Sequence, residues 1–147
     1  MPGCGIFRPV RLEGVAGARI EDLHVRTIDC SRRHADIAVA VQLDTNTPQE
    51  SGLRYPLVCK LSLTGQDTRL EQTLRFQPGR NYQSTIIRLD NPHLWQPNGY
   101  GQPSLYKLAA DLYSGVEHLD HITKDVGIRT VHLNRTKDTR GQSFRFE

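Results

Sequence analysis

The stretch from Glu117 to His121 (EHLDH) places two imidazoles and two carboxylates within five residues. Both groups are zinc ligands in proteins. On a regular strand, however, residues 118 and 121 point to opposite faces, so His118 and His121 would meet only if the chain turned there. No third and fourth ligand follows at the spacing of known zinc sites. We therefore expect no metal site, and the sequence suggests no cofactor.

Carboxylates that lie close together could also work as a general acid and base. The local acidic groupings are Glu21-Asp22 and the set formed by Glu117, Asp120 and Asp125. Acidic side chains are rarely buried without a partner, so we interpret these groupings as solvated faces. We expect no catalytic residue among them.

The chain has three cysteines, Cys4, Cys30 and Cys59, and no CxxC pair. An odd number without close pairs indicates neither a disulfide framework nor a zinc site. Cys59 lies in the alternating run VCKLSL, which favours a small buried hydrophobic residue.

The only tryptophan, Trp95, lies in the Pro- and Gly-rich stretch NPHLWQPNGYGQPSLYKL (91–108). Together with Tyr100 it could form an exposed platform for a sugar ring. Alternatively, the prolines fix the loop so that the indole closes one end of a core. We favour this second reading and expect Trp95 to be largely buried. Asn98, Tyr100 and Gln102 are then candidates to face a neighbouring domain or the mouth of a barrel.

The composition is that of an ordinary globular domain: 147 residues, 37% hydrophobic, 24% charged, net charge +3. The charges are interspersed, and Arg32-Arg33-His34 is too short for a nucleic-acid footprint. No apolar run approaches the roughly 20 residues that span a bilayer, so we expect neither nucleic acid nor membrane as a partner. Asn134-Arg135-Thr136 is a glycosylation sequon, which matters only in a secretory eukaryotic host.

Period-two alternation of apolar and polar residues predicts β-strands along the whole chain. In the segment 18–29 the alternation changes phase by Ile28, which indicates a bulge. Turn residues separate the segments, and none shows helical spacing of apolar residues. The pattern predicts an all-β protein, an immunoglobulin-like antiparallel β-sandwich of about seven strands. The predicted strand segments are 18–29, 34–45, 55–65, 70–76, 82–90, 105–113 and 126–133.

Both ends of the chain read as strands already under way, GIFRPVRL at residues 5–12 and SFRFE at 143–147. We therefore expect a piece of a longer polypeptide. Phe7, Arg8, Phe144 and Phe146 would then lack partner surface, and apolar edges of this kind favour self-association.

Four motifs in this order resemble one family: GIFRPVRLE, LDNPHLWQPNGYGQPSLYKLAADLYSG, DVGIRTVHL and the terminal SFRFE. The chain resembles the segment that joins the first and third domains of family 2 glycoside hydrolases, above all in the β-mannosidase and exo-β-glucosaminidase branch. The matching positions are Gly5, Ile6, Phe7 and Arg8; Asn91, Pro92, Leu94, Trp95, Pro97, Pro103, Leu105 and Tyr106; and Gly127, Ile128 and Arg129.

This resemblance implies three parts: residues 1–12 end a preceding jelly-roll domain, 13–135 form the sandwich, and 136–147 lead into a missing catalytic barrel. It implies a non-catalytic spacer whose partners are the flanking domains of a retaining β-glycosidase of carbohydrate metabolism. Carbohydrate would be bound only through that parent. The family's acid/base Glu follows an Asn, and this chain has no Asn-Glu dipeptide. The alternative reading is an independent fibronectin-like binding or adhesion module.

Overall fold

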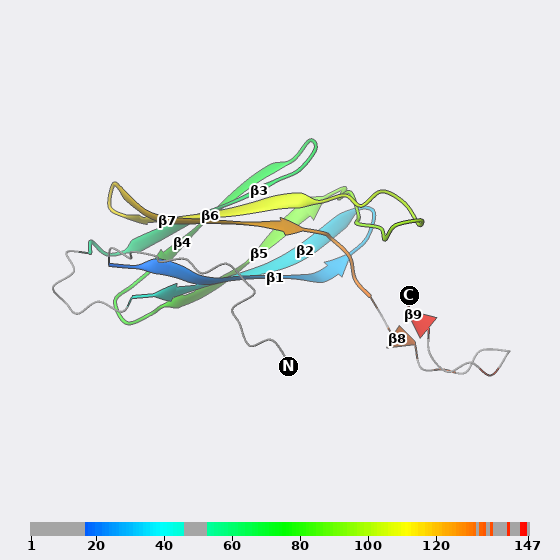
Figure 1. Ribbon diagram of the computed structural model, residues 1–147, viewed down its shortest axis with the longest axis horizontal. Coiled ribbons are helices and arrows are strands. Elements are labelled where there is room, and N and C mark those ends of the chain that lie inside the picture. Colours follow the sequence, from blue (N-terminus) through cyan, green and yellow to red (C-terminus); the bar gives the residue numbers. More distant parts are fainter. Residues whose placement is uncertain are drawn as a thin grey trace, which may run out of the picture.

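The computed structural model describes residues 17–45, 53–131, 133–134, 136, 141 and 145–146, and these form strands and connecting turns (Figure 1). Within them, no helix is long and apolar enough to cross a membrane. The strands are β1 (Arg19–Cys30), β2 (His34–Asp44), β3 (Leu57–Thr64), β4 (Arg69–Phe76), β5 (Tyr82–Asp90), β6 (Tyr106–Ser114), β7 (Glu117–Val126), β8 (Leu133–Asn134) and β9 (Arg145–Phe146).

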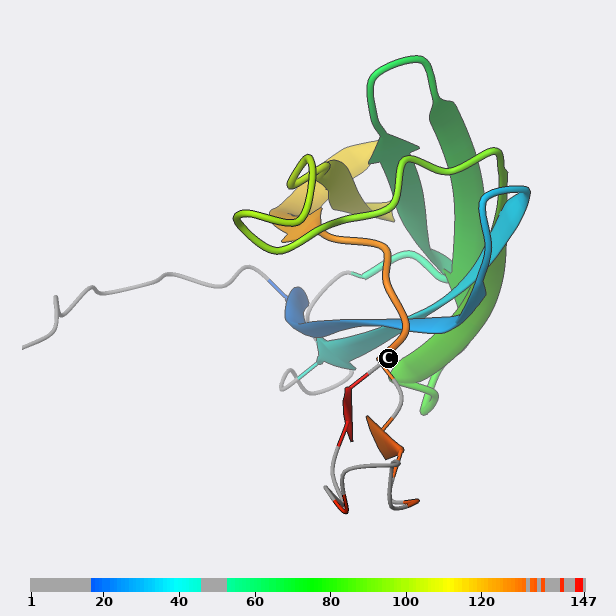
Figure 2. The same ribbon diagram turned by 90° about the vertical axis from the view of Figure 1, so that its right-hand side faces the viewer.

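Seven of these strands form two sheets, one ordered β1-β2-β5 and the other β4-β3-β6-β7. All pairings are antiparallel. Figures 1 and 2 show the sheets as two layers. Consecutive strands belong to different sheets at β2 and β3, at β4 and β5, and at β5 and β6. The predicted immunoglobulin-like sandwich is confirmed. Its fourth strand pairs with the third strand, whereas constant-type immunoglobulin domains place the fourth strand in the other sheet.

The core lies between the layers because alternate residues of each central strand point inward. In β2 and β3 every second side chain is buried. Cys59 is fully buried, as the alternation predicted. The largest fully buried side chains come from both sheets and from one loop: Leu23, Ile37, Leu43, Leu57, Leu61, Leu63, Phe76, Ile87, Leu108, Leu112 and Ile128.

Polar contacts join the edge strands β1 and β7, where the two sheets meet along one side. Asp120 turns inward from β7, and its Oδ2 accepts the backbone N–H of Ile20 at 2.7 Å. The Lys124 ammonium donates to the backbone carbonyl of Leu23 and reaches Oδ1 of Asp22 at 3.5 Å. β1 and β7 belong to different sheets and are not paired as neighbouring strands. These side-chain contacts therefore connect the two sheets along this side.

The strand predictions were correct for six segments and wrong for the seventh. The bulge expected near Ile28 is confirmed, because the β1–β2 register shifts between Thr27 and Asp29. In the segment 126–133, the described residues are strand only at Val126, the last residue of β7, and at Leu133 of β8. The seventh strand is instead β7, whose polar sequence EHLDHITKDV hides its periodicity, since an edge strand with a bulge exposes both faces in part.

The predictions for the chain ends concern mostly residues outside the described part. Residues 1–16, with Phe7 and Arg8, and Phe144 lie outside it. Within the terminal SFRFE the described residues are 145–146, which form β9, and Phe146 pairs there with Leu133 of β8. The domain boundaries at 12 and 135 remain predictions.

Candidate functional site

The loop from 91 to 105, between β5 and β6, is held to the segment that leaves β7. The N–H of Trp95 donates to the carbonyl of Ile128 at 3.0 Å. Trp95 also forms an isolated antiparallel bridge with Pro103, and the N–H of Gln96 donates to the carbonyl of Gln102 at 3.1 Å. The loop therefore folds back on itself with Trp95 at its base.

The indole packs against residues of a second sequence motif. A Cβ added at Gly127 would lie 2.9 Å from Cγ of Trp95, so the ring lies directly on this glycine. The guanidinium of Arg129 lies over the indole, 5.7 Å from the ring centroid, and forms a cation–π contact with it. Most of the surface of Trp95 is covered, as expected, although the residue is not fully buried. It still serves as a structural closure, because backbone, glycine and arginine all fix its position.

The segment after β7 crosses one end of the sandwich from one sheet to the other (Figure 2). Ile128 is fully buried in the core. Thr130 then reaches β1, where its hydroxyl lies 3.5 Å from Sγ of Cys30. The motif Gly127-Ile128-Arg129 and the following Thr130 therefore connect the Trp95 loop, the core and β1.

Tyr106 at the start of β6 fixes the other side of the same loop. Its side chain is 2% exposed, and its hydroxyl accepts the backbone N–H of His93 at 2.8 Å. Its ring lies against Gly65, where an added Cβ would approach two ring carbons to 2.4 Å. A buried tyrosine that bonds the backbone upstream is the arrangement of the immunoglobulin tyrosine corner.

The three candidates for facing a neighbouring domain or a barrel mouth differ in environment from Trp95. Tyr100 is 83% exposed at the loop tip, and Asn98 and Gln102 are also exposed. Trp95 is held at the base by residues 127–129. The loop tip is therefore a free surface, whereas the base is a packing joint.

The acidic groupings lie on strands of both sheets, and three of their carboxylates contact hydrogen-bond donors. Glu21 accepts the amide of Gln42 at 2.7 Å, and Asp22 faces Lys124. Asp120 is half-buried and accepts two backbone N–H groups. Glu117 and Asp125 are exposed on β7.

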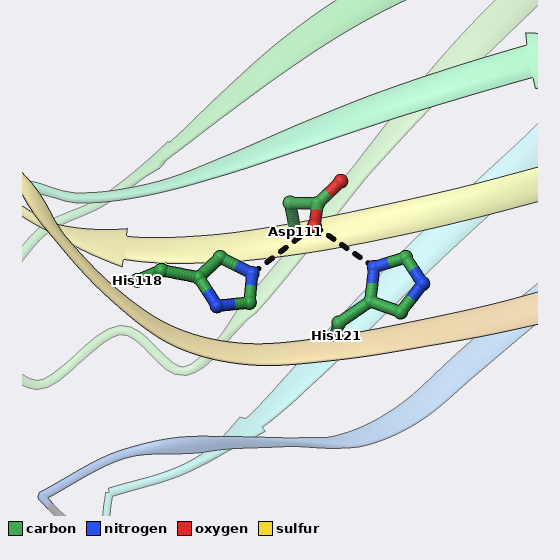
Figure 3. A group of neighbouring side chains, drawn as sticks. All are labelled: Asp111, His118 and His121. Atoms are coloured by element: carbon green, nitrogen blue, oxygen red, sulfur yellow. Dashed lines mark hydrogen bonds and ion pairs between the residues drawn. The ribbon is translucent and has the colours of Figure 1, made fainter.

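His118 and His121 do not point to opposite faces, so that sequence expectation was wrong. Nε2 of His118 lies 3.1 Å and Nδ1 of His121 lies 2.8 Å from the same Oδ1 of Asp111 (Figure 3). The reason is a bulge: Leu112 pairs with Asp120 and Tyr113 with His118, which leaves Leu119 without a partner. Asp111 was not anticipated from the sequence, because only the β6–β7 register brings it opposite His121.

The cluster of Asp111, His118 and His121 lies on the outer face of the four-stranded sheet. Partial burial raises the pKa of the Asp111 carboxyl, but hydrogen bonds from His121 and His118 outweigh burial and leave that pKa below its ordinary value. The ring of Tyr113 meets His118 edge-on at 5.1 Å between centroids. The ammonium of Lys60, whose residue pairs with Asp111 across β3 and β6, lies 4.8 Å from the Tyr113 ring centroid.

The Asn134-Arg135-Thr136 sequon stays a prediction. Asn134 belongs to the short strand β8, and Arg135 lies outside the described residues.

The fold and the joint around Trp95 define an immunoglobulin-like sandwich domain with a closed end. A family model described as glycosyl hydrolases family 2 matches residues 18–129. The chain is 32% identical to β-mannosidase B of Emericella nidulans over 142 residues, and 34% identical to that of Aspergillus terreus over 146. Each match covers 97% of this chain and 16% of the relative. The chain belongs to family 2 of the glycosyl hydrolases.

Solved structures agree with this assignment. The β-D-mannosidase from Dictyoglomus thermophilum superimposes with a TM-score of 0.73 at 29% identity, over 92% of this chain and 16% of that one. A β-glucuronidase from Bacteroides uniformis has a TM-score of 0.67 at 16% identity, over 90% of this chain and 16% of that one, and so shares the fold.

Proposed function

We propose that this chain is the non-catalytic immunoglobulin-like domain of a longer family 2 β-glycosidase. In that protein it spaces a sugar-binding-like domain from a catalytic barrel and supports both. The observation that carries the proposal is the match over 97% of this chain to 16% of the β-mannosidases. In a protein of that length, a sandwich domain of this size would connect its neighbours rigidly, and the catalytic residues would lie in another domain.

The chemistry of the described carboxyl groups supports a non-catalytic role. Retaining glycosidases use one carboxyl whose pKa is raised and a second that is ionised, about 5–5.5 Å apart. Here Arg88 donates two hydrogen bonds of 2.8 Å to Asp36 and lowers the pKa of that carboxyl. Despite partial burial, which raises it, hydrogen bonds from His121 and His118 likewise lower the pKa of the Asp111 carboxyl. Both groups are thus held as anions, the opposite of a proton donor.

Exposed apolar residues supply surfaces that flanking domains would cover. On the outer face of the three-stranded sheet, Tyr82 and Ile86 are each 58% exposed on β5. Beyond β7, Val131 is 55% and Leu133 42% exposed in the segment that leaves the sandwich. Large apolar side chains that remain exposed in one domain are common at contacts with another.

The non-catalytic role is tested by incubating the purified chain with chromogenic aryl β-mannoside, β-galactoside, β-glucuronide and β-glucosaminide. A full-length family 2 β-mannosidase serves as the positive control. We expect no turnover by this chain. Turnover that survives purification and disappears on replacing Asp111, Asp120 or Asp125 with Ala would overturn the proposal.

The supporting role is tested in the longer gene product. We expect its reading frame to continue after Glu147 into a barrel that contains an Asn-Glu pair. In that protein, Trp95→Ala should lower the temperature at which hydrolysis is lost, because the joint at the sandwich end would loosen. The matched control is Val116→Ala, since Val116 is 99% exposed in the β6–β7 turn. Equal inactivation temperatures for Trp95→Ala and the unmodified protein would contradict the supporting role.

A further inference from the structure

We propose that Asp111, His118 and His121 form a binding site for a divalent transition-metal ion, zinc in the first place. The inference concerns this chain alone and does not depend on the proposed spacer role. Three potential ligand atoms, one from each residue, lie within 4.8 Å of one another on the outer face of β6 and β7.

The bulge in β7 creates the cluster. Leu119 packs against the core, and the next residue, Asp120, also turns toward the opposite sheet to accept the N–H of Ile20. Two successive inward residues shift the phase of the strand, so that His118 and His121 both reach the outer face. The β6–β7 register then sets Asp111 opposite His121.

Two of the separations between ligand atoms are close to those of a metal site, whereas the three atoms together span up to 4.8 Å, so the two imidazoles must move toward each other to bind one ion. With Zn–N and Zn–O bonds of about 2.0–2.1 Å and tetrahedral angles, ligand atoms lie about 3.3 Å apart. The observed separations from Oδ1 of Asp111 are 3.1 Å to His118 and 2.8 Å to His121. Figure 3 shows both imidazoles directed at that one oxygen, while the second carboxylate oxygen points away. A cation would enter by replacing the ring N–H protons that now make these hydrogen bonds.

The ligand types select the class of metal. Imidazole favours zinc, copper, nickel and iron, whereas calcium and magnesium require oxygen ligands in larger number. The side chains of His118 and His121 are 46% and 48% exposed, and that of Asp111 is 31% exposed. An ion can therefore reach the cluster from solvent, and water can complete its coordination. The ion would link β6 to β7 across their bulge.

Two neighbours shape the site. Tyr113 contacts His118 edge-on and limits the rotation of that ring. The residue that pairs with Asp111 between β3 and β6 is Lys60, and its ammonium rests over the Tyr113 ring. We expect Lys60→Met to strengthen metal binding, because it removes a like charge while keeping much of the apolar stem.

The experiment is a calorimetric titration of the chain with zinc chloride, on protein purified without a polyhistidine tag. Cys4 and Cys30 are replaced by Ser beforehand, because thiolates also bind zinc. We expect one zinc per chain, a rise in the thermal unfolding midpoint with zinc, and no binding of calcium at the same concentrations. Cobalt added in place of zinc should give the visible absorption bands of a tetrahedral site.

Variants separate this site from general surface binding. Asp111→Asn, His118→Ala and His121→Ala should each weaken zinc binding at least about tenfold, since even the loss of an outer-shell partner costs 10–100-fold. The matched control is His34→Ala, because His34 is an exposed histidine paired with Asp29 at 3.1 Å without a third ligand. Unfolding midpoints without metal verify that each variant is folded. The proposal is wrong if no stoichiometric binding occurs, or if His34→Ala weakens binding as much as His121→Ala.

Discussion

Replacing Gly127 with alanine should destabilise the domain through Trp95. The added Cβ would lie 2.9 Å from Cγ, 3.0 Å from Cδ1 and 3.1 Å from Cβ of Trp95. Ordinary carbon contacts are about 3.5–4.0 Å, so the indole must move away from the added methyl group. Rotation of the ring alone does not relieve the conflict, because the Cβ of Trp95 is one of the three atoms that are too close. Overpacking of this kind costs about 1–3 kcal/mol.

Retreat of the ring also strains two contacts. The Trp95–Ile128 backbone hydrogen bond is worth about 1 kcal/mol, and the Arg129 cation–π contact about 0.5–1 kcal/mol. Against this, alanine restricts the unfolded chain more than glycine and so adds about 0.4–1 kcal/mol of stability. The net loss expected for Gly127→Ala is therefore about 2 kcal/mol.

The assay is urea unfolding of a double-mutant cycle with Trp95→Ala, with the slope m monitored for each variant. Without the indole, the cost of Gly127→Ala should vanish or reverse, because only the entropic gain remains. Gly79→Ala is the control: Gly79 has φ of +75° and nothing within 4 Å of an added Cβ. Its cost should be the same with and without Trp95. An unchanged loss for Gly127→Ala in the Trp95→Ala background would refute the reasoning.

Three further results are expected. Tyr106→Phe should lower the free energy of unfolding by about 1–3 kcal/mol, because a part-buried backbone N–H loses its acceptor, as urea unfolding would show. Asp120→Ala should cost a similar amount, about 1–3 kcal/mol, and should increase hydrogen exchange at the N–H of Ile20. Burial raises the pKa of the Cys59 thiol to about 12, so a thiol reagent at pH 8 should modify Cys30 before Cys59, and Cys59 only through unfolding, as peptide mass mapping would detect.

The central strands could be predicted from the sequence because their two faces differ sharply. Segments such as 34–44 and 57–64 alternate between core and surface without interruption, and the structure follows them. β7 was missed because it is an edge strand: Asp120 and Lys124 turn toward β1 where an apolar residue would have marked the inner face. Period-two reasoning assumes one phase along a strand, and the bulge at Leu119 changes it.

The two candidate sites depended on different kinds of information. The role of Trp95 could be anticipated from local chemistry, since Pro and Gly around an indole indicate a fixed loop. Its degree of burial depended on Gly127 and Arg129, about thirty residues away in the sequence. The histidine cluster depended wholly on the pairing of β6 with β7, because a carboxylate on one strand and imidazoles on the next meet only in one register.

The bulge that brings the histidines together also changes how this protein can meet copies of itself. An incoming strand needs a regular row of free N–H and C=O groups, and a bulge or an inward-pointing charge interrupts that row. β7 has both, and β1 at the same side has register shifts at two places. The ladders of β4 and β5, at the other side, contain no such shift. Edge-to-edge growth of β-structure between molecules is therefore directed to β4 and β5, and one proline at an outward N–H of each of these two strands should suppress it.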